Sequence, residues 1–288
     1  MMDHMAKIGV NTFGLGPYLR QDAASVWKGL LSGGVGAVEP CAAFHAHTDM
    51  DDAYRAAQAR GVFDGMFPVE TAPALIASLR AMGFQVFSFQ LQETPFSLDE
   101  LATVLPFMEA NGLHYCVYSL MDSSVERVRT MADTICQAVQ MFQKSGVELL
   151  FHNHDMEWAE DQGTSVMEWL LENIPQLRFE IDLGWTQYAG VDPVALLRGY
   201  PNRFPLLHIK EIAKGAKAWS GSPFCTAPGE GILPLGELLK AASELSFEEV
   251  AILIDQDDSV SGNIVDDISR GVENICRIWE KYALRDPF

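Results

Sequence analysis

The sequence predicts a single-domain α/β protein, an eight-stranded parallel (β/α)8 barrel (a TIM barrel), over residues 1–288. Three observations favour this fold class. Short apolar runs alternate with amphipathic helical stretches along the whole chain, which is typical of a parallel sheet. Eight such units in 288 residues fit the usual size of one barrel. Hydrophobic residues make up 48% of the chain, enough for a closed core, and no long linker divides it.

The eight apolar runs are the predicted strands. Their near-continuous apolar character indicates strands that are covered on both faces. The runs lie at residues 7–13, 34–39, 84–91, 113–119, 147–153, 177–183, 204–210 and 249–255. No GxGxxG motif follows the first run, which disfavours an open dinucleotide-binding sheet.

Helical signals fill the segments between the runs. Over residues 124–143, apolar side chains recur at steps of three and four, which predicts one amphipathic helix. Ser123 and Glu126 have the spacing of a capping box at its start, and Gly146 is the expected stop. Further helix starts are predicted at Ser97/Glu100, Ser165/Glu168 and Asp192-Pro193, with a closing helix over 264–283.

Two connections are longer than a barrel requires, at residues 40–70 and 211–233. Both follow strands, so they belong to the end of the barrel where active sites lie. We expect the loop 211–233, with Lys214, Lys217 and Trp219, to cover part of the barrel mouth.

Composition excludes several classes of function. The formal net charge is −19 and basic residues do not cluster, so a nucleic-acid partner is not expected. No apolar run approaches the roughly 18–20 residues of a membrane span, and no signal peptide is apparent. The five scattered cysteines include no CxxC pair and indicate reduced thiols in a cytoplasmic protein. The expected partner is a small neutral or metal-chelated ligand. The oligomeric state is open, with a homo-oligomer as one option.

Ionisable side chains stand at the ends of four consecutive predicted strands, where a barrel strand should be apolar. They are His152, His154, Asp155 and Glu157; Glu180 and Asp182; His208, Lys210 and Glu211; and Asp255, Asp257 and Asp258. Because side chains alternate along a strand, Asp182, His208 and Asp255 are predicted to point into the barrel.

A buried carboxylate or imidazole without a partner costs several kcal/mol, so this convergence predicts a bound cation. Oxygen and imidazole ligands without cysteine suit Mn2+, Mg2+, Co2+, Fe2+ or Zn2+. Each residue also has an ordinary structural explanation: His208 as a hydrogen-bonded histidine, Lys210 and Glu39 as ion-paired residues. Asp257 and Asp258 are expected to be turn residues, and His45 and His47 loop residues. The joint occurrence on four strands gives the metal hypothesis its weight.

At these residues the sequence resembles the xylose isomerase-like superfamily of sugar isomerases and epimerases, which includes D-tagatose 3-epimerase-like enzymes, inosose dehydratases and the endonuclease IV group. The resemblance covers most of the chain. It rests on FHNHDMEW (151–158), EIDLGWTQYAGVDP (180–193), LLHIKE (206–211), PGEGILP (228–234) and IDQDD (254–258). The motif set is specific to the superfamily and not to one reaction.

The resemblance implies one divalent metal ion held by His152, Asp182, His208 and Asp255. The chain departs from the family pattern at several positions. His152 stands where the family usually has glutamate, and His154 and Glu157 are the alternatives for that ligand. Asp255 also stands in place of glutamate. Glu211 replaces an aspartate, and Trp185 replaces the histidine with which many epimerases contact substrate.

The implied activity is that of a metal-dependent sugar or cyclitol isomerase or epimerase, which removes a proton next to a carbonyl and stabilises an enediolate with the metal. Asp255, Glu157 and Lys210 are the catalytic candidates. The substrate-binding candidates are Glu39, His154, Trp185, Lys214 and Trp219. The alternatives are a keto-sugar dehydratase or lyase on the same site, and a metal- or sugar-binding barrel without catalysis. An apurinic endonuclease is disfavoured by the acidic charge.

Overall fold

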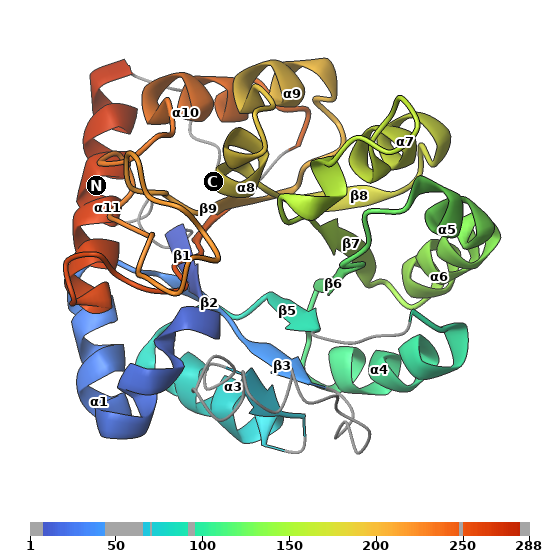
Figure 1. The fold of residues 1–288 in the computed structure, drawn as a ribbon. Coiled ribbons are helices and arrows are strands. Elements are labelled where there is room, and N and C mark those ends of the chain that lie inside the picture. The colour runs from blue at the N-terminus through green and yellow to red at the C-terminus, as the bar shows by residue number, and fades with distance from the viewer. Residues whose placement is uncertain (1–7, 44–65, 70, 92–95, 248–249, 283–288) are drawn as a thin grey trace.

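A ring of parallel strands surrounded by helices forms the centre of the molecule (Figure 1). The computed structural model describes residues 8–43, 66–69, 71–91, 96–247 and 250–282. Neighbouring strands follow the order β2-β1-β10-β9-β8-β7-β6-β5-β3-β4, and every pairing between them is parallel. The predicted (β/α)8 barrel is confirmed.

Each of the eight predicted runs contains a strand. The strands are β1 (Ile8–Asn11), β2 (Ala37–Glu39), β3 (Cys41–Ala43), β4 (Met66–Pro68), β5 (Ser88–Leu91), β6 (Tyr115–Ser119), β7 (Glu148–His152), β8 (Arg178–Asp182), β9 (Leu206–Ile209) and β10 (Ala251–Ile254). The ring closes between β2 and the segment before β5, where the Val38 amide donates to the Gln85 carbonyl at 2.9 Å. The Gln85 amide in turn donates to the Gly36 carbonyl at 2.8 Å.

The two ends of segment 40–70 are strands, so the prediction of a loop is wrong there. β3 follows β2 directly after Pro40 and finds pairing partners on both sides. Cys41 lies in register with Gln90 of β5 and with Met66 of β4. His45 and His47 lie outside the described residues.

Helices cover the outside of the ring (Figure 1). They are α1 (Gly16–Ser32), α3 (Ala72–Met82), α4 (Leu98–Ala110), α5 (Val125–Thr130), α6 (Ala132–Lys144), α7 (Val166–Asn173), α8 (Leu183–Tyr188), α9 (Pro193–Gly199), α10 (Leu235–Ser243) and α11 (Ile264–Tyr282), with 3-10 turns η2 (Phe13–Leu15) and η3 (Met156–Trp158). None of the helices in these ranges is long and apolar enough to cross a membrane.

Three helix starts are capped as predicted. Ser97 accepts a hydrogen bond from the Glu100 amide, and Asp192 accepts from the second and third amides of α9. Ser165 and Glu168 form a complete capping box at α7.

The helix predicted over 124–143 is two helices. Met131 ends α5 and starts α6, and the cap of α5 is Ser124 rather than Ser123. The apolar stripe survives the break because Val128, Ile135 and Phe142 remain buried. Periodicity alone therefore could not show the interruption.

The interior of the ring has two layers. Val117, Leu150, Leu206 and Leu253 form an apolar cluster, separate from the larger core between strands and helices. His152, His208 and Asp255 each follow one of these leucines by two residues and thus point to the same side. The polar layer at the carboxyl ends of the strands therefore rests on an apolar floor.

Candidate metal centre

The polar layer brings together four side chains from four neighbouring strands. His152, Asp182, His208 and Asp255 each offer one ligand atom, and these atoms lie within 4.8 Å of one another. All four residues are buried. Asp182 of β8 lies in register with His208 of β9, so the convergence follows directly from the strand pairing.

Two carboxylate oxygens in this group have no hydrogen-bond partner among the described residues. They are Oδ2 of Asp182 and Oδ1 of Asp255. A buried carboxylate oxygen without a partner is costly, and a cation removes that cost. Because the remaining donors are imidazole nitrogens, the group fits a divalent metal ion.

The two carboxylate oxygens of Asp182 have different roles, one in the fold and one in the ligand group. Oδ1 accepts a hydrogen bond of 2.8 Å from the Trp185 amide and so caps α8, while Oδ2 has no such partner. Asn153 fixes the backbone beneath, because its Oδ1 accepts from the Asp182 amide at 2.9 Å. Burial raises the pKa of Asp182 to about 7. A bound cation would stabilise the ionised form and reverse that shift.

His208 lies between carboxylates on both sides of its ring. Its Nδ1 is 3.3 Å from Oδ2 of Asp255, and its Nε2 is 3.0 Å from Oε1 of both Glu39 and Glu180. Burial alone would lower the pKa of His208, but the charge of Glu180 and hydrogen bonds to Asp255 and Glu39 raise it well above its ordinary value.

His152 is a neutral imidazole in these surroundings. Burial and the neighbouring His208 lower its pKa well below the ordinary value. Its Nδ1 lies 3.0 Å from Oε2 of Glu180. Metal-binding histidines are neutral, so this environment suits a ligand.

Lys210 is a fully buried ammonium paired with two carboxylates. Its Nζ lies 3.0 Å from Oδ2 of Asp255 and 2.8 Å from Oδ1 of Asp257. Burial would lower the pKa of Lys210, but these two aspartates raise it well above the ordinary value. Burial would raise the pKa of Asp255, but Lys210 and His208 lower it strongly. Lys210 is thus charged, and it keeps Asp255 ionised.

The two aspartates that follow Asp255 have different roles. Asp258 joins two loops, because its Oδ1 accepts from the amides of Phe224 and Cys225 in the loop after β9. Asp257 is not a simple turn residue, because its carboxylate completes the Lys210 ion pair.

Glu157 is not part of the ligand group, although it was a candidate for metal binding and catalysis. Its Oε1 accepts a hydrogen bond of 3.0 Å from the Met121 amide, and its Oε2 accepts one of 2.9 Å from the His154 amide. Burial raises the pKa of Glu157 to about 7. The carboxylate therefore ties the loop after β6 to the loop after β7.

His154 lies at the edge of the group. Its ring is 5.1 Å from that of His152 and 6.2 Å from that of Trp185, measured between centroids. The Nδ1 atom has no hydrogen-bond partner among the described residues, and burial lowers the pKa of the ring to about 4. This neutral ring fits a substrate-facing position.

Trp219 brings the long loop after β9 over the mouth. Its ring stacks on Trp185 with centroids 5.0 Å apart and planes 4° apart, and its Nε1 donates to Oδ1 of Asp155 at 3.4 Å. Trp219 is 63% exposed and has a positive φ of 62°. This places the loop 211–233 as predicted, with Lys214 exposed on it.

Trp185 does not offer a free ring face to a substrate, in contrast to the prediction. It is buried in an aromatic cluster beneath Trp219 and beside Phe224. The Nζ atom of Lys210 lies 5.5 Å from its centroid. Trp185 therefore supports Lys210 and Trp219 rather than standing open at the mouth.

Glu39 lies below the ligand group. The ring of His208 separates it from the mouth, where it was predicted to contact a substrate. Oε1 of Glu39 accepts from Nδ2 of Asn11 at 2.8 Å and faces Nε2 of His208. Glu39, Glu180 and His208 form a second buried group with ligand atoms within 4.8 Å of one another. Asn11 and Glu180 were not site candidates, although the alternation already put Glu180 on the face of Asp182.

Glu211 has a structural role. Its two oxygens accept from the amides of Gly229 and Leu233, both at 2.8 Å, and so hold the turn over residues 228–234. A Cβ at Gly231 would collide with the Ile212 carbonyl and with the Glu211 carboxylate, which explains glycine at this position.

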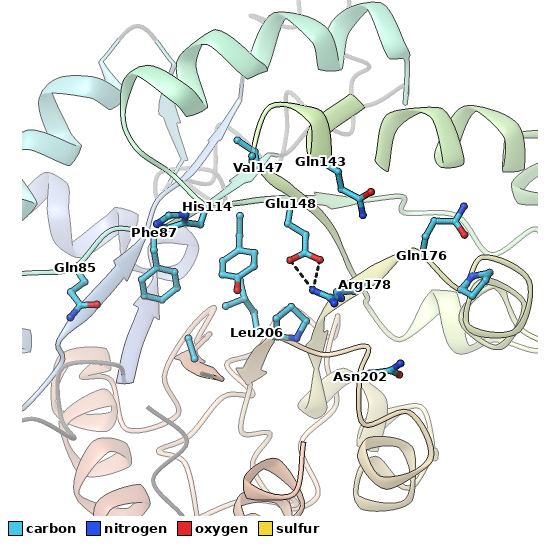
Figure 2. A pocket seen from close by; sticks show the side chains of 15 residues that line it. Gln85, Phe87, His114, Gln143, Val147, Glu148, Gln176, Arg178, Asn202 and Leu206 are labelled. Atoms are coloured by element: carbon cyan, nitrogen blue, oxygen red, sulfur yellow. Dashed lines mark hydrogen bonds and ion pairs between the residues drawn. The ribbon is translucent and has the colours of Figure 1, made fainter. Parts of the chain in front are cut away.

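A cavity of about 860 Å3 lies at the opposite end of the barrel (Figure 2). Residues at or before the starts of strands line it, among them Phe87, His114 and Leu206. Glu148 and Arg178 form an ion pair of 2.8 Å inside it. The amino-terminal face of a barrel carries stability rather than chemistry, so this cavity is not the candidate active site.

Comparisons with known proteins agree with the fold described above. The family model of the xylose isomerase-like TIM barrel matches residues 96–277. An inosose dehydratase from Clostridium beijerinckii is 24% identical over 152 residues, which are 47% of this chain and only half of that protein's length. A crystal structure of a sugar phosphate isomerase/epimerase from Parabacteroides distasonis is 18% identical, with a TM-score of 0.64 and 93% of both chains covered. A xylose isomerase-like barrel from Mycobacterium smegmatis in complex with magnesium has a TM-score of 0.58 at 12% identity, covering 96% of this chain and 97% of its own.

Proposed function

The chain belongs to the xylose isomerase-like TIM barrel family, and we propose that it is a metal-dependent isomerase or epimerase of a sugar or cyclitol. One observation carries the proposal. Four buried nitrogen and oxygen ligands converge from four neighbouring strands, and two of their oxygens have no hydrogen-bond partner among the described residues. Such a group is costly without a cation and ready to bind one.

His152, Asp182, His208 and Asp255 are the proposed ligands of one divalent ion. Mn2+, Mg2+, Co2+, Fe2+ and Zn2+ all accept this donor set. The magnesium in the Mycobacterium smegmatis relative supports a divalent cation in this barrel type. When bound, such an ion supplies a Lewis acid that polarises a substrate carbonyl.

Asp255 is the proposed base for the proton next to that carbonyl. Lys210 holds Oδ2 of Asp255 at 3.0 Å, while Oδ1 has no hydrogen-bond partner among the described residues. Lys210 keeps this carboxylate ionised, which a base requires. His154 and Trp219 are the proposed substrate contacts at the rim, because both lie next to the group and the His154 Nδ1 has no such partner either.

A one-base reaction fits these residues better than a symmetric two-base epimerisation. Glu157, the candidate for a second base, is held by two backbone amides. A single base suffices for aldose–ketose isomerisation and for dehydration of a keto-sugar. The inosose dehydratase relative makes dehydration the second candidate function.

The proposed substrate is uncharged. Lys210 is the buried ammonium of the site, and two aspartates already neutralise it. A phosphorylated sugar would bring two negative charges to a protein with a net charge of −19.

Metal content and product analysis test the proposal. We expect one divalent ion per chain in the wild type and none in Asp182→Ala or His208→Ala, with the fold retained by circular dichroism. Glu148→Ala, at the other end of the barrel, is the control and should keep its metal. Full occupancy in both site variants would refute the assignment of the ligands.

Keto-sugars and inososes in D2O distinguish the two reactions by NMR. An isomerase gives a product of unchanged composition, with deuterium where exchange competes with internal proton return. A dehydratase gives a product that has lost one water. A wild type that binds no metal and turns over none of these compounds would favour the binding barrel without catalysis.

A further inference from the structure

Glu180 lies between the two imidazole rings of the metal centre. Its Oε2 is 3.0 Å from Nδ1 of His152, and its Oε1 is 3.0 Å from Nε2 of His208. The residue is completely buried on β8, on the same strand face as Asp182 and one layer deeper. It therefore contacts both histidines from below.

These contacts determine which ring nitrogen His152 can offer to a cation. A carboxylate oxygen accepts hydrogen bonds, so the Nδ1 of His152 that faces Oε2 of Glu180 is the protonated nitrogen of that ring. The Nε2 atom of His208 donates to Oε1 of Glu39, and Oε1 of Glu180 lies beside it without a hydrogen bond. This leaves the lone pair of Nε2 on His152 for a cation. Both nitrogens of His208 face carboxylates, so a cation at its Nδ1 would replace a proton there. The Nδ1 atom of His208 lies 3.3 Å from Oδ2 of Asp255, which confirms that this edge of the ring faces the ligand group.

We propose that Glu180 is a positioning residue that holds the ligand His152 in its metal-binding tautomer. The inference rests on the proposed metal centre and extends it. Carboxylates behind metal-bound histidines orient the ring and raise its basicity, and their loss typically weakens metal binding by about 10–100-fold.

The two histidines depend on Glu180 to different degrees. His208 has an acceptor of its own, because its Nε2 donates to Oε1 of Glu39 at 3.0 Å. Glu180 is the acceptor that the structure gives for Nδ1 of His152. Loss of the Glu180 carboxylate should therefore release the ring of His152 and leave that of His208 oriented.

Glu180→Gln is the test, because it keeps the shape of the side chain and offers only one oxygen as an acceptor. We expect the Kd for Co2+, titrated through its visible absorption, to rise about 10–100-fold. In 15N NMR of the metal-free protein, the Nδ1–H tautomer of His152 should dominate in the wild type and be lost in the variant. The 15N signals of His208 should be the same in both proteins. Glu148→Gln, on the adjacent strand and at the opposite end, is the matched control and should change neither.

The outcomes separate this inference from the proposed function. A wild type that binds no Co2+ refutes the metal centre itself. A wild type that binds Co2+, with an unchanged Kd and unchanged tautomers in Glu180→Gln, refutes the positioning role alone. Two Co2+ per wild-type chain would instead assign Glu180 and Glu39 as ligands of a second ion, and would also overturn it. If Glu180→Gln does not fold, the tautomer of His152 in the wild type decides.

Discussion

Buried carboxylates in this barrel have pKa values shifted in opposite directions, according to their nearest partner. Asp255 is ionised because Lys210 lies against it, whereas burial raises the pKa of Asp182 and of Glu157 to about 7. Desolvation favours the neutral acid, and a fixed positive charge favours the anion. Carboxylates that the sequence motifs present as alike therefore differ in pKa, because their surroundings in the fold differ.

Glu157 should make the protein less stable as the pH rises. Its folded pKa of about 7 lies above the usual unfolded value, so the native state binds more protons than the unfolded chain between these two values. Stability from this residue is present below the unfolded pKa and lost as the pH rises to about 7. In Glu157→Gln that loss is absent. We expect the free energy of unfolding of the variant, relative to wild type, to increase by up to about 3 kcal/mol from pH 4 to pH 8.

Urea denaturation of the metal-free proteins at several pH values measures this difference. A difference that stays constant with pH would contradict the raised pKa of the buried Glu157. The difference in unfolding free energy between the two proteins is the quantity to compare. His152 and His154 are present in both, and their lowered pKa values make the folded protein more stable as the pH rises, which opposes the effect of Glu157.

The elements show where residue patterns were sufficient and where they were not. The alternation along β8 and β9 was enough to predict that Asp182 and His208 point inward, because a parallel register turns equivalent positions to the same side. The interruption at Met131 was not predictable, since both helices keep the apolar stripe in phase. The structural role of Glu157 was not predictable either, because its carboxylate accepts a hydrogen bond from the Met121 amide in another loop.

The capping box of α7 offers a test at this scale. Ser165 accepts from the Glu168 amide, and Glu168 in return accepts from the Ser165 amide at 2.9 Å. Ser165→Ala should lower the free energy of unfolding by about 1 kcal/mol, because it removes one cap of an eight-residue helix. Ser123→Ala is the control. Ser123 is exposed and Ser124 is the actual cap of α5, so an equal loss in both variants would contradict the assignment.

The ring as a whole brings together residues that are far apart in the chain. Asn11 and Glu39 reach His208 only because β1 and β2 close the barrel against β10. Local pattern could identify each of these strands but not the polar layer that they share. The family resemblance supplied the ligand set, but not the contacts of Glu39 with His208 and of Glu180 with His152.

Metal binding should stabilise the whole molecule, because the four ligands join four strands of one cooperative ring. At a free concentration of Mn2+ 100 times its Kd, the gain is about 2.7 kcal/mol. We expect the Tm to rise with added Mn2+ and to fall back with EDTA. Asp182→Ala should show no rise. An equal rise in this variant would mean that Mn2+ acts elsewhere on the acidic surface.

The apolar floor formed by Val117, Leu150, Leu206 and Leu253 lies across the inside of the barrel, beneath the mouth. Among the described residues, this layer separates the mouth from the cavity at the other end, which Leu206 also lines. In the proposed reaction, substrate and product would therefore share the opening beside Trp219. We expect the product to act as a competitive inhibitor of its own formation, and the rate at which it leaves to set an upper limit on turnover.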